Sequence, residues 1–333
     1  MTVLITGASG FIGSNLYNFL LNKKVECWRF VRDSANLQNV NDKVVYGDIS
    51  NLDDCKRAIA KSNPDIVYHL AAQSIVGIAS KDPIRTFESN IAGTYNMLEA
   101  VRLYGSGACS VVIASSDKAY GEKDGEYYED DPMAGRGIYD VSKSCTDLIA
   151  QSYSAMTKMK IGIVRSGNVY GPGDRNDSRI IPSTIKNLIN GTKIILRSDG
   201  SHVRNYIHVS DVVKFYEAIG LFVLSKRDNF PVTFNIAGNE TISVLELVNK
   251  IIELYSMIYK NYMSLSFYHP QKPYGIIIGK NSSDEIKFQS LNTDKFFKTF
   301  ATSFKKCDMI GLNYGLMELL RQELNKNGYI HNP

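Results

Sequence analysis

The sequence predicts an α/β fold, in which a doubly wound parallel sheet is joined to a smaller C-terminal α/β lobe. Short apolar runs alternate with longer amphipathic stretches through the first half of the chain, which is the pattern of buried parallel strands connected by helices. A glycine-rich loop directly follows the first apolar run. The length of 333 residues is more than twice that of a common domain of roughly 100–150 residues, so the chain has room for two lobes.

The predicted elements follow one another in a βαβα order. The apolar runs predict strands at 3–5, 25–31, 43–46, 66–70, 110–114 and 161–165, and the amphipathic segments predict helices at 11–22, 52–61, about 84–104 and 139–157. After about residue 170 the pattern loosens into short strands and turns, with helices at about 210–224 and 243–258. We therefore expect one domain at 1–170 and a second at 171–333, interleaving after about residue 200. The stretch 259–300 has weak periodicity and supports no firm element.

The composition is that of a globular protein. Hydrophobic residues make up 44% and charged residues 22% of the chain, which excludes disordered and fibrous classes. The net charge of +4, from 38 basic and 34 acidic side chains, is small and dispersed. It argues against a nucleic-acid partner and leaves room for a basic site that takes an anionic small molecule.

The cysteines and histidines form no pattern typical of a disulfide framework or a metal site. The five cysteines, at 27, 55, 109, 145 and 307, include no CxxC pair, and His69, His202 and His208 are interpreted as packing or hydrogen-bonding residues rather than metal ligands. No apolar stretch reaches the roughly 18 residues of a membrane span, and no basic segment precedes the first apolar one. We expect a cytoplasmic protein with no membrane partner, signal peptide or anchor.

The loop after the first strand has the spacing of a dinucleotide-binding turn. It contains Gly7, Ser9, Gly10, Phe11, Ile12 and Gly13 in a GxxGxxG pattern that opens a helix. Glycines let the backbone approach a pyrophosphate, whose charge then meets the N–H groups of the helix N-terminus. An ordinary tight βα turn is the alternative interpretation.

Two further segments favour a dinucleotide. Asp48 and Ile49 follow the third predicted strand, where the carboxylate can accept a hydrogen bond from an adenine amino group. The fourth strand ends in small and apolar residues that leave room for a cofactor beside the sheet, at Leu70, Ala71 and Ala72.

The end of the second strand bears on the choice of cofactor. Arg32 precedes Asp33 there. An aspartate at this place accepts from the ribose hydroxyls of NAD, whereas a guanidinium pairs with the 2′-phosphate of NADP. Because Arg32 lies nearer the expected strand end, the sequence favours NADP, with NAD as the alternative.

Candidate catalytic residues lie at two places. Tyr139 and Lys143 are four residues apart and share one face of a predicted helix. An ammonium and an oxidised nicotinamide nearby would lower the pKa of the phenol from its usual value of about 10. Ser116, Asp117 and Lys118 follow the fifth strand, at the edge of the sheet where ligands bind in doubly wound folds.

Taken together, these motifs resemble a known superfamily. TGASGFIG, HLAAQ, SSDKAYG, YDVSK, RSGNVYGPGD and RNYIHVSDV, in this order, are similar to the extended short-chain dehydrogenases/reductases that modify nucleotide sugars, from residue 1 to about 240. The Asp-Lys pair after the serine resembles the 4,6-dehydratase branch, of the CDP-glucose 4,6-dehydratase type. The resemblance implies a Rossmann domain that binds NAD(P) and a C-terminal lobe that binds a nucleotide sugar.

The resemblance also implies a reaction and roles for the residues in it. Tyr139 takes the proton of the carbon-4 hydroxyl while Lys143 holds the cofactor ribose and Ser116 bonds the same hydroxyl. Asp117 protonates the hydroxyl that leaves carbon 6, and the product is a 4-keto-6-deoxy sugar nucleotide. Contacts with the nucleotide sugar are implied for Asn168, Arg179 and Arg204.

Lys118 departs from the glutamate that many members of the branch carry, and two interpretations stay open. A neutral Lys118 would be the base at carbon 5, which requires burial to lower its pKa by several units. A charged Lys118 would instead stabilise the enolate at carbon 4, with another group or water as the base.

Two rival functions remain at this stage. A 4-epimerase on the same scaffold needs Tyr139 and Lys143 but no acid at position 117. An inactive NADP-sensing regulatory protein needs the cofactor loop and no catalytic set. Many members of the superfamily dimerise through the helices that here correspond to about 84–104 and 139–157, so the resemblance predicts a homodimer.

Overall fold

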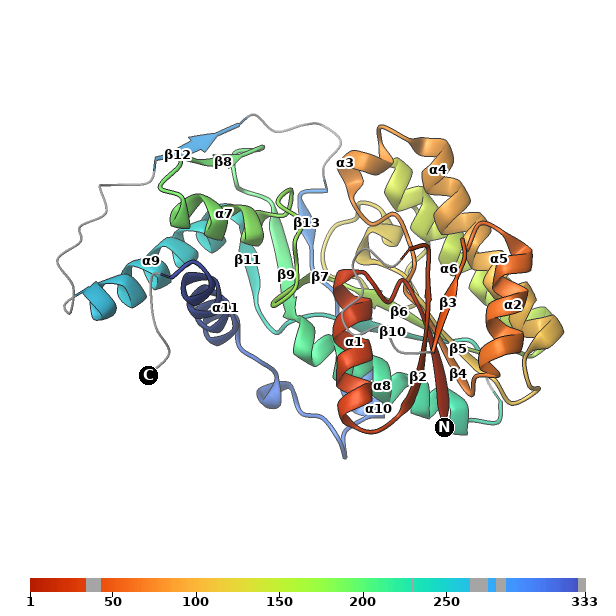
Figure 1. Ribbon diagram of the computed structural model, residues 1–333. Helices are drawn as coiled ribbons and strands as arrows, with labels where there is room; N and C mark the ends of the chain where they lie inside the picture. Colours follow the sequence, from red (N-terminus) through yellow and green to blue (C-terminus); the bar gives the residue numbers. More distant parts are fainter. Residues whose placement is uncertain (34–42, 229, 264–274, 280–285, 329–333) are drawn as a thin grey trace.

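A computed structural model describes residues 1–33, 43–228, 230–263, 275–279 and 286–328 (Figure 1). Its main sheet has seven strands, and each pair of neighbours in it is parallel. The strands, in spatial order, are β10 (Val232–Ile236), β6 (Lys160–Ser166), β5 (Ser110–Ala114), β4 (Ile66–His69), β1 (Thr2–Thr6), β2 (Glu26–Val31) and β3 (Val44–Tyr46). The strand order reverses between β1 and β4, and such a switch point is where open α/β sheets bind ligands.

Helices cover both faces of this sheet (Figure 1). One face carries α2 (Leu52–Ser62), α5 (Gly93–Tyr104) and α6 (Ile138–Thr157), and the other carries α1 (Phe11–Asn22), α8 (Val209–Ser225) and α10 (Asp294–Thr299). Because successive side chains of a strand point to opposite faces, Leu4 packs into the first layer while Val3 and Ile5 pack into the second. The predicted doubly wound parallel sheet is therefore confirmed.

One predicted helix is interrupted. The segment predicted as a helix at about 84–104 follows α3 (Val76–Ala79) and consists of α4 (Pro83–Phe87), a π-helical turn at Glu88–Ala92, and α5. The wide turn holds Asn90, whose amide donates to the Ser142 hydroxyl at 2.8 Å and accepts from the Gln73 N–H at 2.7 Å. Its hydrogen bonds to α6 and to the segment after β4 account for the departure from a regular α-helix.

The second lobe is built on smaller sheets. β9 (Val203–His208) pairs with β7 (Asn168–Tyr170), β11 (Thr241–Ser243) and β13 (Phe288–Gln289), and β8 (Ile194–Leu196) pairs with β12 (Ile276–Ile278). Its core lies among three helices, α7 (Ile180–Ile189), α9 (Val244–Met263) and α11 (Leu312–Lys326). Two 3₁₀ turns, η2 (Asp117–Tyr120) and η3 (Lys306–Asp308), complete the described elements.

The chain passes between the two lobes more than once. Helix α8 packs on the seven-stranded sheet and β10 forms its edge, although both follow the first strands of the second lobe. The division at residues 170 and 171 therefore stays a prediction about folding units. Within 259–300, the short strands β12 and β13 and the six residues of α10 account for the weak periodicity, and 264–274 and 280–285 lie outside the described residues.

Candidate functional site

A cavity of about 1100 Å³ opens where the strands of the large sheet end and the second lobe begins. This volume exceeds the roughly 300–1,000 Å³ of a pocket for one drug-sized ligand. All the predicted site residues line it. We call one group of them the glycine-loop wall, formed by Gly7, Ser9, Gly10, Phe11, Ile12, Gly13, Arg32, Asp48, Ile49, Leu70, Ala71 and Ala72. We call the other the acid-turn wall, formed by Ser116, Asp117, Lys118, Tyr139, Lys143, Asn168, Arg179 and Arg204.

Close backbone contacts shape the glycine-loop wall. Gly7 has φ +65°, and a Cβ there would lie 2.8 Å from the Cα of Ala71. A Cβ on Gly13 would lie 2.2 Å from the Gly7 carbonyl oxygen, which accepts a hydrogen bond from the Gly10 N–H at 2.9 Å. Side chains at these glycines would therefore push apart β1, α1 and the end of β4.

The N-terminus of α1, which follows the loop, also fits the phosphates of a dinucleotide. Gly10 is the N-cap of α1, and no side chain caps that helix. The first N–H groups of a helix have no partners within it, so this end of α1 can meet a phosphate. The Thr6 hydroxyl accepts from the N–H groups of Leu70 and Ala71, both at 3.1 Å, and fixes the end of β4 beside the loop.

The residues predicted to contact the adenosine part lie at the rim of this wall. The Asp48 carboxylate accepts from the N–H and the hydroxyl of Ser50, at 2.9 and 2.8 Å. Arg32 is exposed and lines the cavity directly after β2. Both side chains lie where the sequence expects them, and their roles toward a cofactor stay predictions.

The acid turn is a short 3₁₀ turn that follows β5. The Ser116 hydroxyl caps it by accepting from the Lys118 N–H at 3.2 Å, and donates to the Asp117 carboxylate at 2.9 Å. Asp117 is only 6% exposed. Burial raises the pKa of its carboxyl group, while the nearby Lys118 charge is the strongest influence in the opposite direction. The turn thus places a shielded carboxyl group in the cavity wall.

Tyr139 and Lys143 project from the first turns of α6 into the same wall. The Lys143 ammonium donates to the Ala114 carbonyl at 2.7 Å, and burial lowers its pKa to about 8. Burial raises the pKa of Tyr139 to about 12, against the lowering effect of a hydrogen bond with Ser116. The predicted lowering of the phenol pKa is therefore not achieved by the folded chain alone, because burial outweighs the neighbouring groups.

The three residues predicted to contact a nucleotide sugar all have partners within the chain. The buried Arg204 guanidinium donates to the carbonyls of Val203 and Ile286, at 2.8 and 2.5 Å. Arg179 pairs with Asp174 at 3.0 Å, and the Asn168 amide donates to the Asn205 carbonyl at 3.4 Å. These contacts orient the side chains at the cavity and do not by themselves assign a ligand.

The histidines are engaged as the sequence indicates. Buried His69 contacts the hydroxyls of Thr6 and Thr94, at 3.0 and 3.4 Å, and burial lowers its pKa to about 3. His202 bonds the Ser198 hydroxyl, and the ring of His208 packs edge-on against Tyr170. Across the part of the chain that the structure describes, no cluster of three or more His, Cys, Asp or Glu side chains has the arrangement of a metal site.

Sequence reasoning missed several cavity residues. Asp140, Arg136 and Arg197 line the cavity, as does Ser115, whose buried hydroxyl has no hydrogen-bond partner among the described residues. Asp140 directly follows Tyr139, and Arg197 directly follows β8, so a search for polar residues beside the motifs and at strand ends of the second lobe would have found them. Arg136 lies in a loop with no local signal of its own.

Comparison with known proteins places this fold and cavity in a family. Residues 3–237 match the NAD dependent epimerase/dehydratase family, and the chain belongs to it. The chain is 29% identical over 274 residues to the CDP-glucose 4,6-dehydratase of Salmonella typhimurium, with 76% of each chain covered. The predicted membership of the extended short-chain dehydrogenases/reductases is thus confirmed, and relatives in the 4,6-dehydratase branch are among those found.

Solved structures agree in fold over nearly the whole chain. The dTDP-glucose 4,6-dehydratase of Bacillus anthracis in complex with NAD has a TM-score of 0.80 at 26% identity, and the match covers 98% of this chain and 97% of that one. The UDP-glucose 4-epimerase of Thermotoga maritima has a TM-score of 0.81 at 23% identity, with 98% and 100% covered. Both confirm the fold class. Among the described helices, none combines the length and apolar character that crossing a membrane requires.

Proposed function

We propose that this protein is a nucleotide-sugar 4,6-dehydratase that converts a nucleoside-diphosphate hexose to its 4-keto-6-deoxy form. One observation carries the proposal: a shielded carboxyl group, Asp117, lies in the same cavity wall as Tyr139 and Lys143. Burial raises the pKa of Asp117, which favours the protonated form that an acid catalyst needs. Oxidation at carbon 4 does not use such an acid, whereas elimination of water does.

Each residue of the acid-turn wall has a task in this reaction. The Tyr139 phenolate accepts the proton of the carbon-4 hydroxyl, and Ser116 bonds the same oxygen. Asp117 donates a proton to the hydroxyl that leaves carbon 6, and water is released. Lys143 holds the ribose of the cofactor. A nicotinamide held at the glycine loop would supply the hydride acceptor for carbon 4 and the hydride donor for carbon 6. A proton returns to carbon 5 in that last step, so the net change is the loss of one water.

The surroundings of Lys118 support its charged form. The positive charge of Lys118 lowers the pKa of Asp117 and of Asp140, against the raising effect of burial, so both carboxyl groups lie close enough to interact with it. With Asp117 protonated as the acid, Asp140 is the neighbouring carboxyl group whose ionised form favours an ammonium over a neutral amine at Lys118. We therefore assign Lys118 to stabilise the enolate oxygen at carbon 4 after the carbon-5 proton leaves to another group or to water.

The glycine-loop wall and the arginines favour two anionic ligands in one cavity. A nicotinamide dinucleotide occupies the glycine loop in this proposal, and Arg204, Arg179 and Asn168 contact the nucleotide sugar. The B. anthracis relative holds NAD in its structure, whereas Arg32 favours NADP here, so the choice of NADP remains a prediction. The predicted homodimer is supported by exposed apolar side chains on α5 and α6, among them Tyr104 and Leu148.

A 4-epimerase is the alternative that the comparisons keep open, because an epimerase shares this fold. An epimerase would use Tyr139 and Lys143 and would need no catalytic role for Asp117. A protein that binds NADP without catalysing a reaction would need no catalytic role for the acid turn or for Tyr139.

Mass spectrometry of the product distinguishes these functions. We expect the protein, given NAD⁺ or NADP⁺, to remove one water from one of the CDP-, UDP-, dTDP- or GDP-hexoses, with UDP-N-acetylglucosamine included in the set. Replacing Asp117 with Asn keeps the size and removes the acidic proton, so water loss should fall by about 10²–10⁴-fold. The matched control is Asp124→Asn, an exposed acid outside the cavity in the loop that follows the acid turn.

The outcomes separate the candidates. If Asp117→Asn releases water as fast as the wild type, Asp117 is not the acid that protonates the leaving hydroxyl. Unchanged mass with an altered sugar NMR spectrum in the wild type would establish an epimerase. Cofactor binding without any product from the whole set would establish the sensor.

A further inference from the structure

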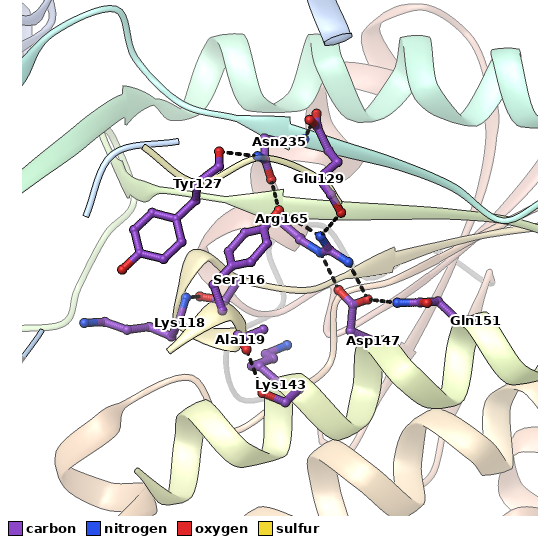
Figure 2. Close-up of polar contacts among 12 residues, drawn as sticks. Ser116, Lys118, Ala119, Tyr127, Glu129, Lys143, Asp147, Gln151, Arg165 and Asn235 are labelled. Atoms are coloured by element: carbon purple, nitrogen blue, oxygen red, sulfur yellow. Dashed lines mark hydrogen bonds and ion pairs between the residues drawn. The ribbon is translucent and has the colours of Figure 1, made fainter. Parts of the chain in front are cut away.

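A buried charged network lies behind the acid-turn wall (Figure 2). Arg165 on β6 pairs with Asp147 on α6 through two contacts of 2.8 and 2.9 Å, and both side chains are almost fully buried. The same guanidinium donates to the Tyr120 hydroxyl and to the Glu129 carbonyl, each at 2.8 Å. The Tyr120 hydroxyl in turn donates to the Asn235 side-chain carbonyl at 2.7 Å.

This network joins the two elements that carry the candidate catalytic groups. Tyr120 ends the 3₁₀ turn that begins with Asp117, and Asp147 lies one helical turn beyond Lys143 on α6. Arg165 also stacks on the Tyr120 ring, with its guanidinium carbon 4.7 Å from the ring centroid. A planar guanidinium fixed by a bidentate carboxylate has few orientations, so it fixes the position of the Tyr120 side chain against α6.

A second contact links the same elements without Arg165. The Ser144 hydroxyl on α6 donates to the Ala119 carbonyl in the 3₁₀ turn at 2.8 Å. We therefore expect that deleting the Tyr120 hydroxyl leaves the turn attached to the helix and changes only the orientation of the turn.

The members of the network do not touch the reacting atoms. Tyr120, Asp147 and Arg165 are absent from the cavity lining. A buried ion pair is also a weak contributor to stability, because desolvation offsets much of the attraction and apolar replacements are often as stable. Holding the acid turn in one orientation is a role that fits both the burial and the directional hydrogen bonds.

We propose that Tyr120 and Arg165 are positioning residues that fix the place of Asp117 relative to Tyr139. With this spacing, the carboxyl group of Asp117 lies at the carbon-6 hydroxyl of the sugar while the phenol of Tyr139 lies at the carbon-4 hydroxyl. The inference rests on the proposed dehydratase function. A displacement of about 1 Å can reduce a rate by about 10²-fold. Elimination uses Asp117 within the turn. Oxidation at carbon 4 uses Tyr139 and Lys143 on α6, and from the turn only its cap residue Ser116, which lies close to the end of β5. Elimination is then more sensitive to this network than oxidation.

The Tyr120→Phe variant tests the proposal by separating the two steps. Rapid-mixing absorbance at 340 nm follows oxidation at carbon 4, and mass spectrometry follows water loss. We expect oxidation within about threefold of wild type, an unchanged KM, and water loss reduced by about 30–100-fold. Tyr153→Phe, which removes a hydroxyl from α6 that bonds Glu99 at 3.3 Å outside the cavity, is the control and should change neither step.

Equal reduction of both steps, or no reduction of either, would overturn the positioning role. Arg165→Lys supplies a second variant: it keeps the charge and loses the bidentate contact, so the same selective loss of elimination is expected. Wild-type protein that oxidises carbon 4 and never releases water would refute the proposed function instead, a result that is distinct from any difference between variant and wild type.

Discussion

The two walls of the cavity are built from different parts of the chain. In the glycine-loop wall the decisive contacts are between backbone atoms, as where a Cβ on Gly13 would meet the Gly7 carbonyl at 2.2 Å. In the acid-turn wall the decisive groups are three shielded ionisable side chains, Asp117, Tyr139 and Lys143, each with a pKa shifted by burial. The first wall therefore tolerates no added volume, and the second depends on charge.

The largest expected effect concerns the buried charge of Lys143. Burial lowers the pKa of Lys143 from 10.5 to about 8, so between these values the folded protein binds fewer protons than the unfolded chain. Stability should then rise as pH increases from about 8 toward 10.5, by about 3 kcal/mol from this group. Below pH 8 the full cost of burying the ammonium is present.

Urea denaturation of wild type and Lys143→Met at pH 7, 8, 9 and 10 measures this contribution. Buried Cys27, Cys55 and Cys109, whose pKa values burial raises to about 12, lower stability above pH 9 in both proteins alike. The variant should therefore be more stable than wild type at pH 7, and this difference should shrink as pH rises toward 10, although the variant loses a group proposed to hold the cofactor. Tyr139 titrates above this range in both proteins and does not affect the comparison. A constant difference between the two proteins from pH 7 to 10 would show that Lys143 keeps an ordinary pKa.

The contrast between the walls also explains what the sequence could predict. The glycine loop is local: its spacing, the preceding strand and the following helix lie within 22 residues, and each was predicted where the structure has it. The pairing of Tyr139 with Lys143 follows from helical geometry alone. The convergence of Asp117 with these two follows from the rule that parallel strands end at one edge of a sheet.

What sequence reasoning missed is determined by contacts between distant segments. Nothing near Arg165 indicates that its guanidinium bonds Asp147 and Tyr120, 18 and 45 residues away. The π-helical turn at Asn90 depends on Gln73 and on Ser142 of α6. The pKa of Tyr139 also depends on burial, which outweighs the lowering effects of the hydrogen bond with Ser116 and of the Arg179 charge and has no signature in a four-residue spacing.

A smaller effect is expected from volume added to the glycine-loop wall. Gly13→Ala brings a methyl group against the backbone of Gly7 and Ala8, which cannot move without separating α1 from β1. Overpacking of this kind typically costs about 1–3 kcal/mol, and we expect about 2 kcal/mol in urea denaturation together with weaker dinucleotide binding. Gly107→Ala is the control, since a Cβ there has nothing within 4 Å. Equal stability of the two variants would refute the view that backbone contact limits this wall.

The smallest effect is expected at the exposed rim of the glycine-loop wall. The charged side chain of Arg32 lies there, so this part of the wall depends on charge, as the acid-turn wall does. Arg32 is exposed after β2, so its contact with a 2′-phosphate would be partly screened by water. Arg32→Ala should weaken NADP⁺ binding about tenfold in calorimetry, near the lower limit for a hydrogen bond to a charged group, and should leave NAD⁺ binding within twofold. Asp33→Ala is the converse variant, because an aspartate that accepts from the ribose hydroxyls serves NAD⁺. The prediction of NADP is wrong if the wild type prefers NAD⁺ and if Asp33→Ala, but not Arg32→Ala, weakens NAD⁺ binding. In that case the carboxylate of Asp33, one residue further from the strand, selects the cofactor.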